Sequence, residues 1–278
     1  MFIVIDIGGT NTRVAGSKNL KTAFRKREFP TPKNFLLGLM KISETIENLS
    51  QNKKIKAIAL GLPGVIDRKT GQLLKAPNLK NWVKQPIKNL ISQEFRCPVF
   101  IANDVELSGL GEAAFGAGRK YRLIAYVAIG TGLGGIKIID KEIDKSTQGF
   151  EPGHQIIKLN GPFWPPCGQN GCLESYVGGR AFAQKYKIKP ENCSNPKIWT
   201  DWSQKLGQGL INIIVLWSPQ IIIIGGGFTK KSGLFLKPLK KFINRNLLIF
   251  KTPLIVKGAL GDRAGVYGGF YLIKKVFK

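Results

Sequence analysis

The stretch FIVIDIGGTNTRVAG, residues 2–16, decides the fold. Its first six residues are apolar except for Asp6, which favours a buried strand, and the glycines that follow favour a turn. Residues 13–16 have the apolar character of a second strand, so the whole stretch predicts a β-hairpin with a glycine turn.

The same order of elements returns in the second half of the chain. Residues 123–129 predict a strand, Gly130-Thr131-Gly132 a turn, and residues 135–139 a second strand. Each half also contains a buried strand that ends in glycine, at 55–60 and at 221–224. This recurrence indicates an internal duplication.

The duplication predicts an α/β protein of two lobes, with a ligand cleft between them. We expect one lobe to contain residues 1–104 together with a C-terminal helix at 263–278, and the other to contain residues 105–262. Helical spacing of apolar residues predicts further helices at 33–50, 86–95, 105–115 and 199–217.

The charge balance is strongly basic. The 278 residues include 43 Lys and Arg against 17 Asp and Glu, a formal net charge of +26. Such a charge favours polyanions, but the basic residues are spread along the chain and form no known nucleic-acid-binding motif. We therefore interpret the charge as a basic solvated surface and argue against a nucleic-acid partner.

The composition also bears on location. The longest apolar stretch, 206–228, is interrupted by polar residues and falls short of a membrane span, and the N-terminus lacks the basic start of a signal peptide. Four cysteines in 278 residues do not form a disulfide scaffold. We expect a cytoplasmic protein without a membrane partner.

Both glycine turns suit phosphate binding. Glycines let a backbone approach a phosphate closely, so Gly8, Gly9 and Thr10 can line such a site, and Asp6 can hold Mg²⁺ or its water. The alternative is an ordinary hairpin turn.

The second turn opens the pattern G-x-G-x-x-G at residues 130–135. A dinucleotide-binding loop must open a helix, whereas a strand follows here, so a second phosphate-binding hairpin is the better interpretation. The run Gly225-Gly226-Gly227 can admit a flat ring such as adenine, although a plain strand end explains it as well.

Two further groups of residues have side chains suited to catalysis or metal binding. Asn103-Asp104 lies between a predicted strand and a predicted helix, where it can cap the helix or supply a general base. His154, the only histidine, precedes Cys167 and Cys172, and this combination suits zinc; two free thiols or a local disulfide are the alternatives.

Taken together, these motifs resemble the ROK family of repressors and sugar kinases over essentially the whole chain. The resemblance is carried by Asp6–Thr10, Asn103-Asp104, Gly130–Gly132, Glu151–His154, Cys167–Glu174, Gly225–Gly227 and Leu260–Gly265. It implies an actin-like, ribonuclease H-type ATPase fold with two lobes, and a homodimer.

The resemblance also implies roles for individual residues. Asp104 corresponds to the general base. The matching sugar-binding positions are Gly64, Asn78, Asn103, Asp104, Glu151, His154 and Glu174. The nucleotide-binding positions are Asp6, Gly8, Gly9, Thr10, Gly130, Thr131, Gly132, Gly225, Gly226 and Gly227. The zinc ligands would be His154, Cys167 and Cys172, while Pro165 stands where the family has a further cysteine.

The function that follows is ATP- and Mg²⁺-dependent phosphorylation of a hexose at its primary hydroxyl, with glucose the first candidate. Fructose, mannose and N-acetylhexosamines are alternative acceptors. A non-catalytic sugar-sensing regulator is the alternative of another class; because the first predicted strand begins at residue 2, we expect no preceding DNA-binding domain.

Overall fold

The computed structural model describes residues 1–23, 25–67, 70–76, 78–144 and 149–277. Pro77, beside the expected sugar contact Asn78, and Lys278, the end of the expected C-terminal helix, lie outside the described residues. The chain divides into two compact units. Unit 1 contains Met1–Ala114 and Arg263–Lys278, and unit 2 contains Phe115–Asp262.

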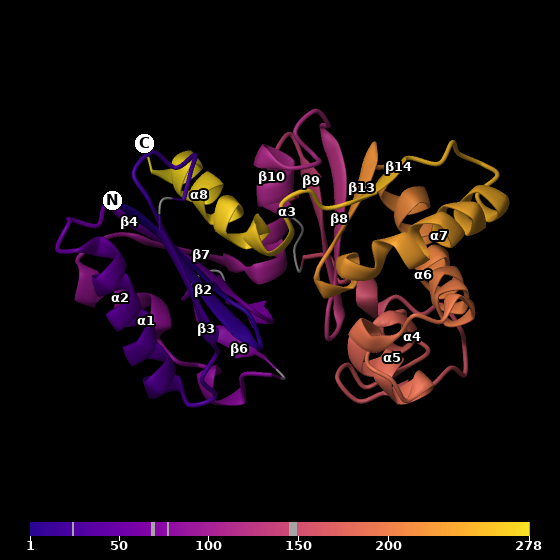
Figure 1. Cartoon of the computed structure of the whole chain (residues 1–278), viewed down its shortest axis with the longest axis horizontal. Helices are drawn as coiled ribbons and strands as arrows, with labels where there is room; N and C mark the ends of the chain where they lie inside the picture. The colour runs from indigo at the N-terminus through magenta and orange to yellow at the C-terminus, as the bar shows by residue number, and fades with distance from the viewer. Residues whose placement is uncertain (24, 68–69, 77, 145–148, 278) are drawn as a thin grey trace. The chain divides into compact units, whose positions relative to one another are not determined.

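Unit 1 is built on a five-stranded sheet with the order β3-β2-β1-β4-β7 (Figure 1). The first three strands are antiparallel neighbours, and β4 and β7 extend the sheet in parallel from β1. The strands are β1 (Phe2–Ile7), β2 (Asn11–Ser17), β3 (Arg25–Pro30), β4 (Ala57–Leu62) and β7 (Val99–Asn103).

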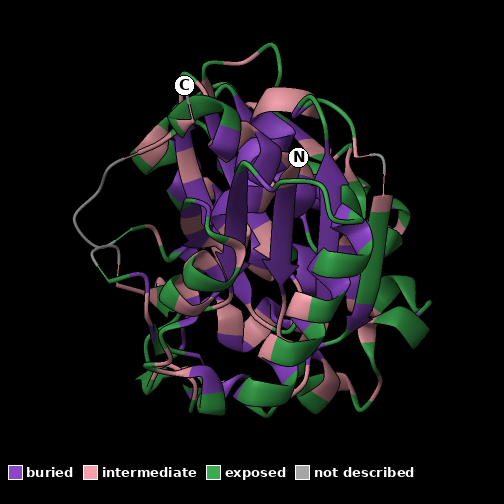
Figure 2. Cartoon of the chain, turned by 90° about the vertical axis from the view of Figure 1, so that its left-hand side faces the viewer, coloured by how far each residue is buried: buried purple, intermediate pink, exposed green. Residues whose placement is uncertain are grey.

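Helices cover both faces of this sheet because β1 is apolar on both sides. Ile3, Ile5 and Ile7 pack in one core cluster with α1 and α2, whereas Val4 packs in another with α8. Figure 2 shows the central strands buried and the outward faces of helices exposed, and the edge strand β3 is largely exposed. The helices of the unit are α1 (Phe35–Ser50), α2 (Ile87–Phe95), α3 (Asp104–Phe115) and α8 (Ala264–Val276).

Close helix contacts explain why unit 1 extends through Ala114, ten residues beyond the boundary expected at residue 104. A Cβ atom on Gly111 of α3 would lie 2.1 Å from the carbonyl oxygen of Ala264 in α8. One on Gly268 of α8 would lie 1.7 Å from the carbonyl oxygen of Leu107 in α3. These glycines let the two helix backbones touch, so α3 packs with the rest of unit 1.

Unit 2 repeats the arrangement, with a five-stranded sheet in the order β10-β9-β8-β13-β14. An antiparallel hairpin is again extended by two parallel strands, as the sequence recurrence predicts. Its strands are β8 (Leu123–Ile129), β9 (Leu133–Ile139), β10 (Glu142–Ile143), β13 (Ile221–Gly225) and β14 (Leu254–Lys257).

The core of unit 2 lies between this sheet and its helices. Apolar side chains of β8 and β13 pack with Trp199, Trp202 and Phe235, whose rings contact one another. The helices are α4 (Glu174–Val177), α5 (Gly179–Tyr186), α6 (Pro196–Trp217) and α7 (Ser232–Asn246).

Short elements complete the fold. Two small hairpins pair β5 (Val65–Ile66) with β6 (Leu73–Lys75), and β11 (Phe163–Trp164) with β12 (Gln169–Asn170). The 3₁₀ turns are η1 (Lys80–Trp82), η2 (Pro152–His154), η3 (Pro190–Asn192), η4 (Gly227–Lys231) and η5 (Gly261–Arg263).

Several elements were not predicted from the sequence, and four of them have a clear physical reason. Strand β3 reads RKREFP, a charged edge strand without an apolar pattern. Helix α7 contains Pro238, which usually interrupts a helix, and α5 and β14 are short. None of the helices in the described parts of the chain is both long and apolar enough to span a membrane.

Candidate functional site

The first glycine turn is held by Thr31, which lies just beyond β3. The backbone N–H of Gly8 donates to the carbonyl of Asn11 over 2.9 Å and closes the turn. Thr31 then donates from its hydroxyl to the carbonyl of Gly8 over 2.8 Å and from its N–H to the carbonyl of Thr10 over 2.8 Å. The turn is therefore rigidly held, and Thr31 is a supporting residue that sequence reasoning missed because β3 was not predicted.

Lys33 joins the same turn to the expected sugar contact Asn78. Its ammonium donates to the carbonyl of Gly9 over 2.9 Å and to the carbonyl of Asn78 over 3.0 Å. A Cβ on Gly9 would lie 3.1 Å from the Cβ of Asn78. Two motifs about seventy residues apart in sequence thus meet at Lys33, which no motif in the sequence singled out.

Asp6 ends β1 on the face covered by α8. Only 7% of the residue is exposed, and burial raises the pKa of its carboxyl to about 6, against a partly opposing effect of Arg13. A Cβ on Gly265 would lie 2.3 Å from an oxygen of this carboxylate, so the backbone of α8 rests directly against it. A cation beside Asp6 would offset its burial, which suits the expected Mg²⁺ role.

Asn103 and Asp104 form the start of α3. The N–H of Val105 donates to the side-chain oxygens of both residues, over 2.8 and 2.9 Å, and the N–H of Asn103 donates to the carboxylate of Glu106 over 3.0 Å. This reciprocal pattern is a capping box. The capping interpretation is therefore confirmed for Asn103, and the carboxylate of Asp104, the next residue, accepts the N–H of Val105.

The amide of Asn103 also holds the Gly64 loop, donating to the carbonyl of Gly64 over 2.8 Å. Gly64 has φ of 103°, and a Cβ there would lie 2.1 Å from the carbonyl oxygen of Lys75. Only glycine fits this position. The structure thus brings the Gly64 loop to Asn103, the neighbour of Asp104 in the chain.

The second glycine turn, in unit 2, is held by Glu174 at the start of α4. One carboxylate oxygen accepts the N–H of Leu133 over 2.7 Å, and the other accepts the indole N–H of Trp164 over 2.6 Å. A Cβ on Gly132 would lie 2.4 Å from the first oxygen. Glu174 therefore supports the second glycine turn, which is a role in addition to the sugar contact that we expected.

The start of α5 also binds this turn. The N–H of Gly179 donates to the carbonyl of Gly130 over 2.8 Å, and the N–H of Arg180 donates to the carbonyl of Thr131 over 3.1 Å. With its carbonyls bound in this way, the turn keeps one backbone conformation. A fixed backbone is the arrangement that a phosphate-binding turn requires.

The three glycines at residues 225–227, where β13 ends, differ in their surroundings. A Cβ on Gly225 would lie 2.0 Å from the Tyr126 hydroxyl, and one on Gly226, with φ of 81°, would lie 2.3 Å from the carbonyl oxygen of Ile129. Gly227 is exposed, and a Cβ there would meet nothing within 4 Å. Packing therefore requires the first two glycines, and Gly227 is the one open to a ligand.

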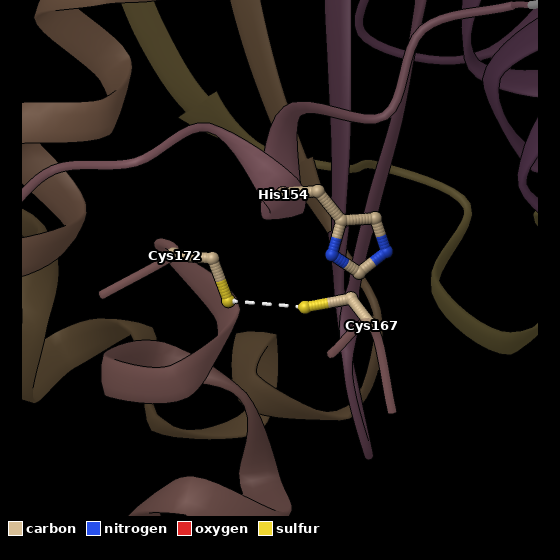
Figure 3. A group of neighbouring side chains, drawn as sticks. All are labelled: His154, Cys167 and Cys172. Carbon is tan, nitrogen blue, oxygen red and sulfur yellow. Dashed lines mark hydrogen bonds between the residues drawn. The ribbon is translucent and has the colours of Figure 1, made fainter. Parts of the chain in front are cut away.

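His154, Cys167 and Cys172 converge from three separate segments of unit 2 (Figure 3). His154 ends η2, Cys167 lies between β11 and β12, and Cys172 precedes α4. Their ligand atoms lie within 4.8 Å of one another, and the Nδ1 atom of His154 is buried without a hydrogen-bond partner. Glu151, at the other end of η2, is exposed and accepts the N–H of His154 at its carbonyl over 3.0 Å.

These three residues fit a zinc ion. The two Sγ atoms are 3.7 Å apart, too far for a disulfide and close to the spacing of about 3.8 Å that tetrahedral Zn–S bonds of about 2.3 Å impose. An unpartnered buried nitrogen beside two thiols is the arrangement that a metal would satisfy. The alternative of a disulfide does not hold for these cysteines, which are free.

The duplicated sheets and their glycine hairpins define the class of protein as one with an actin-like ATPase fold. The chain belongs to the ROK family, whose model matches residues 2–276.

Similar solved structures include ROK kinases. A ROK hexokinase from Thermus thermophilus is 25% identical with a TM-score of 0.86, and each chain is 99% covered. A ROK family glucokinase from Streptomyces griseus, in complex with glucose and AMPPNP, is 26% identical with a TM-score of 0.83 and the same coverage.

Similar sequences include both functional classes of the family. A glucokinase from Thermotoga maritima is 27% identical, with 98% of this chain and 97% of the relative covered. A xylose repressor from Caldicellulosiruptor bescii is 30% identical over 82% of this chain. The chain spans 65% of the length of this repressor and 62% of the length of a putative xylose repressor from another Caldicellulosiruptor strain.

Proposed function

We propose that this protein is an ATP-dependent hexose kinase that transfers a phosphoryl group to the primary hydroxyl of the sugar, with glucose the preferred acceptor. The observation that carries the proposal is the Asp104 carboxylate at the start of α3, which accepts the N–H of Val105 and adjoins Asn103, the residue that holds the Gly64 loop. Relatives named glucokinase and similar over nearly their whole length add support.

Asp104 acts as the general base. It accepts the proton of the sugar hydroxyl as that oxygen attacks the γ-phosphorus of ATP, and the bond from this phosphorus to the bridging oxygen breaks to release ADP. A carboxylate at the N-terminus of a helix is favoured in its ionised form, as a base requires. Asn78, Asn103, Glu151, His154 and Glu174 supply acceptors and donors for the other sugar hydroxyls.

The glycine turns bind the nucleotide. Gly8, Gly9 and Thr10 in unit 1, and Gly130, Thr131 and Gly132 in unit 2, present fixed backbone to the phosphates, and the open position at Gly227 admits the adenosine. Mg²⁺ would neutralise phosphate charge, with Asp6 as the residue that holds it or its water. Phosphoryl transfer depends mainly on positioning and charge stabilisation, which these groups can supply.

Zinc would have a structural role here. His154, Cys167 and Cys172 would hold it, while Pro165 stands where the family has a further cysteine. The ion would tie η2 to the loops before α4 and so fix Glu151 and Glu174 on either side of the ligand set.

The test is a coupled ADP-release assay with glucose, fructose, mannose, N-acetylglucosamine and N-acetylmannosamine as acceptors. We expect sugar-dependent turnover, fastest with glucose. Asp104→Asn should lower kcat by roughly 10²–10⁴-fold and leave sugar binding intact, whereas Asp140→Asn, at an exposed site, should leave kcat unchanged. Near-wild-type turnover of Asp104→Asn would show that Asp104 is not the base.

A sugar-sensing regulator is the second candidate, favoured by the similarity to xylose repressors. That function predicts sugar binding without turnover.

We also propose a cytoplasmic location, supported by four free cysteines, and a homodimer, supported by exposed apolar side chains such as Leu216 and Leu248. Light scattering of the purified protein tests the dimer.

A further inference from the structure

The segment between β3 and α1 bonds to three successive carbonyls of the first glycine turn. Thr31 donates to the carbonyls of Gly8 and Thr10, each over 2.8 Å. Lys33 donates from its ammonium to the carbonyl of Gly9, which lies between them in the chain, over 2.9 Å. The turn is therefore held along its whole length, and the bond at its centre is the one that carries a charge.

The same segment also bonds to the chain around Asn78, the expected sugar contact. The Lys33 ammonium donates to the carbonyl of Asn78 over 3.0 Å, and the indole N–H of Trp82 donates to the carbonyl of Pro32 over 3.0 Å. Trp82 is buried, and its ring meets that of Phe35 edge-on at 5.4 Å. Because the backbone on both sides is anchored in this way, the ammonium of Lys33 joins two fixed carbonyls.

Helix α1 gives no reason for a cation at residue 33. Asn34 caps this helix through its side chain, which accepts the N–H of Leu37 over 3.0 Å, so Lys33 lies directly before the N-cap. Positive charge is unfavourable at the N-terminus of a helix, and the first turn of α1 contains no acid to offset it. Lys33 is also exposed, so core packing does not require it. Its two carbonyl partners are the contacts that explain a lysine here.

The ammonium acts on the nucleotide turn through a peptide group. A cation at a carbonyl oxygen polarises the whole peptide, so the ammonium at the Gly9 carbonyl strengthens the N–H of Thr10 as a hydrogen-bond donor. Thr10 is exposed and belongs to the turn that we expect to bind phosphate. Loss of the ammonium would weaken this donor and would remove the bonds that join the Gly9 and Asn78 carbonyls through one side chain.

We propose that Lys33 is a positioning residue that couples the two substrate-binding parts of unit 1, so that hexose and nucleotide each bind more tightly when the other is present. The inference rests on the proposed kinase function. A nucleotide that orders the Gly9 peptide also orders the Lys33 side chain, which then holds the Asn78 carbonyl before the sugar binds. The entropy of this long side chain is lost once for two ligands, and linkage makes the effect equal in both directions.

The test compares Lys33→Met, which removes the ammonium, with Lys33→Arg, which keeps a charged donor. The control is Lys53→Met, which removes another exposed ammonium of unit 1. Calorimetry measures the Kd of AMPPNP without and with the best acceptor of the sugar panel, and the ratio of the two values is the coupling factor. The coupled assay measures kcat, and urea unfolding measures stability.

We expect a coupling factor of about fivefold in the wild type and below about twofold in Lys33→Met. The Kd of AMPPNP alone should rise about three- to fivefold in Lys33→Met, as expected for one exposed charge-assisted hydrogen bond. The kcat value should change less than about twofold, since Asp104 is untouched. Lys33→Arg should recover most of the coupling, and Lys53→Met should match the wild type in binding, with the same urea midpoint as Lys33→Met.

Three results would overturn the inference. A coupling factor that is unchanged in Lys33→Met would show that Lys33 does not join the two parts. An equal loss of coupling in Lys53→Met would assign the effect to total charge. A lower kcat with unchanged binding constants would place the action of Lys33 in the transition state. Absence of turnover with every sugar in the wild type would instead refute the proposed kinase function, on which the inference rests.

Discussion

We expect Asp6 to destabilise the folded protein at neutral pH, so that Asp6→Asn is more stable than the wild type. Burial raises the pKa of this carboxyl from 3.8 to about 6. Since one pKa unit corresponds to about 1.4 kcal/mol, holding the charged form buried costs about 3 kcal/mol at pH 8. Asn keeps the shape of the side chain and removes the charge.

The pH dependence of stability shows in which direction the Asp6 carboxyl acts. Between pH 3.8 and about 6 the folded chain holds the Asp6 proton more firmly than the unfolded chain. The free energy of unfolding therefore falls as pH rises through this window. The advantage of Asp6→Asn should therefore be smaller at pH 5 and grow to about 3 kcal/mol at pH 8.

Urea unfolding followed by tryptophan fluorescence at pH 5, 6.5 and 8 measures this difference. Asp140→Asn is the control, because Asp140 forms an exposed ion pair with Arg122 and should change stability by less than about 1 kcal/mol. An Asp6→Asn protein that is less stable than the wild type at pH 8 would refute the reasoning. It would show that Arg13 more than offsets the burial of the carboxylate.

Three other predictions follow from the same contacts. Gly64→Ala should lower the free energy of unfolding by at least about 2 kcal/mol, since a Cβ would meet the carbonyl of Lys75. The control Gly261→Ala, at a positive φ with no contact within 4 Å, should lower it by about 1 kcal/mol. Equal losses for the two variants in urea unfolding would contradict the steric argument. Cys167→Ser should reduce the zinc content measured by elemental analysis and lower Tm, whereas Cys97→Ser should keep the metal; full zinc in Cys167→Ser would exclude this ligand. Glu174→Gln should raise KM for ATP and lower the free energy of unfolding by about 1–3 kcal/mol, because the amide has only one oxygen to accept the two N–H groups that the carboxylate binds. An unchanged KM would show that this carboxylate does not support nucleotide binding at the second glycine turn.

The sequence predicted the repeated architecture because periodicity and glycine placement are local signals. The run of apolar residues at 2–7, interrupted only by Asp6, predicted a strand, and the two five-stranded sheets share one strand order. The signal failed where tertiary contacts override local preference. Helix α7 forms around Pro238 because Phe235, Leu239 and Ile243 bury one face against the core.

The residues that support the site were harder to predict than those that define its motifs. Thr31 and Lys33 contact the first glycine turn from a loop after an unpredicted edge strand, with no motif around them. Glu106 was recognisable in principle, since its position three residues after Asn103 is the spacing of a capping box. Contacts of this kind become visible only when strand pairing brings distant segments together.

The glycines at residues 225–227 differ in whether packing explains why the position is a glycine. Gly225 and Gly226 are required by Tyr126 and by the backbone of Ile129, so the fold alone would keep them in any protein with this strand arrangement. Gly227 meets nothing within 4 Å, and packing gives no reason for it to lack a side chain. The proposed nucleotide site would supply such a reason if the ligand approaches this backbone. Gly227→Val should therefore leave the free energy of unfolding within about 0.5 kcal/mol of the wild type and raise KM for ATP, whereas an unchanged KM in the coupled assay would show that this position does not face the nucleotide.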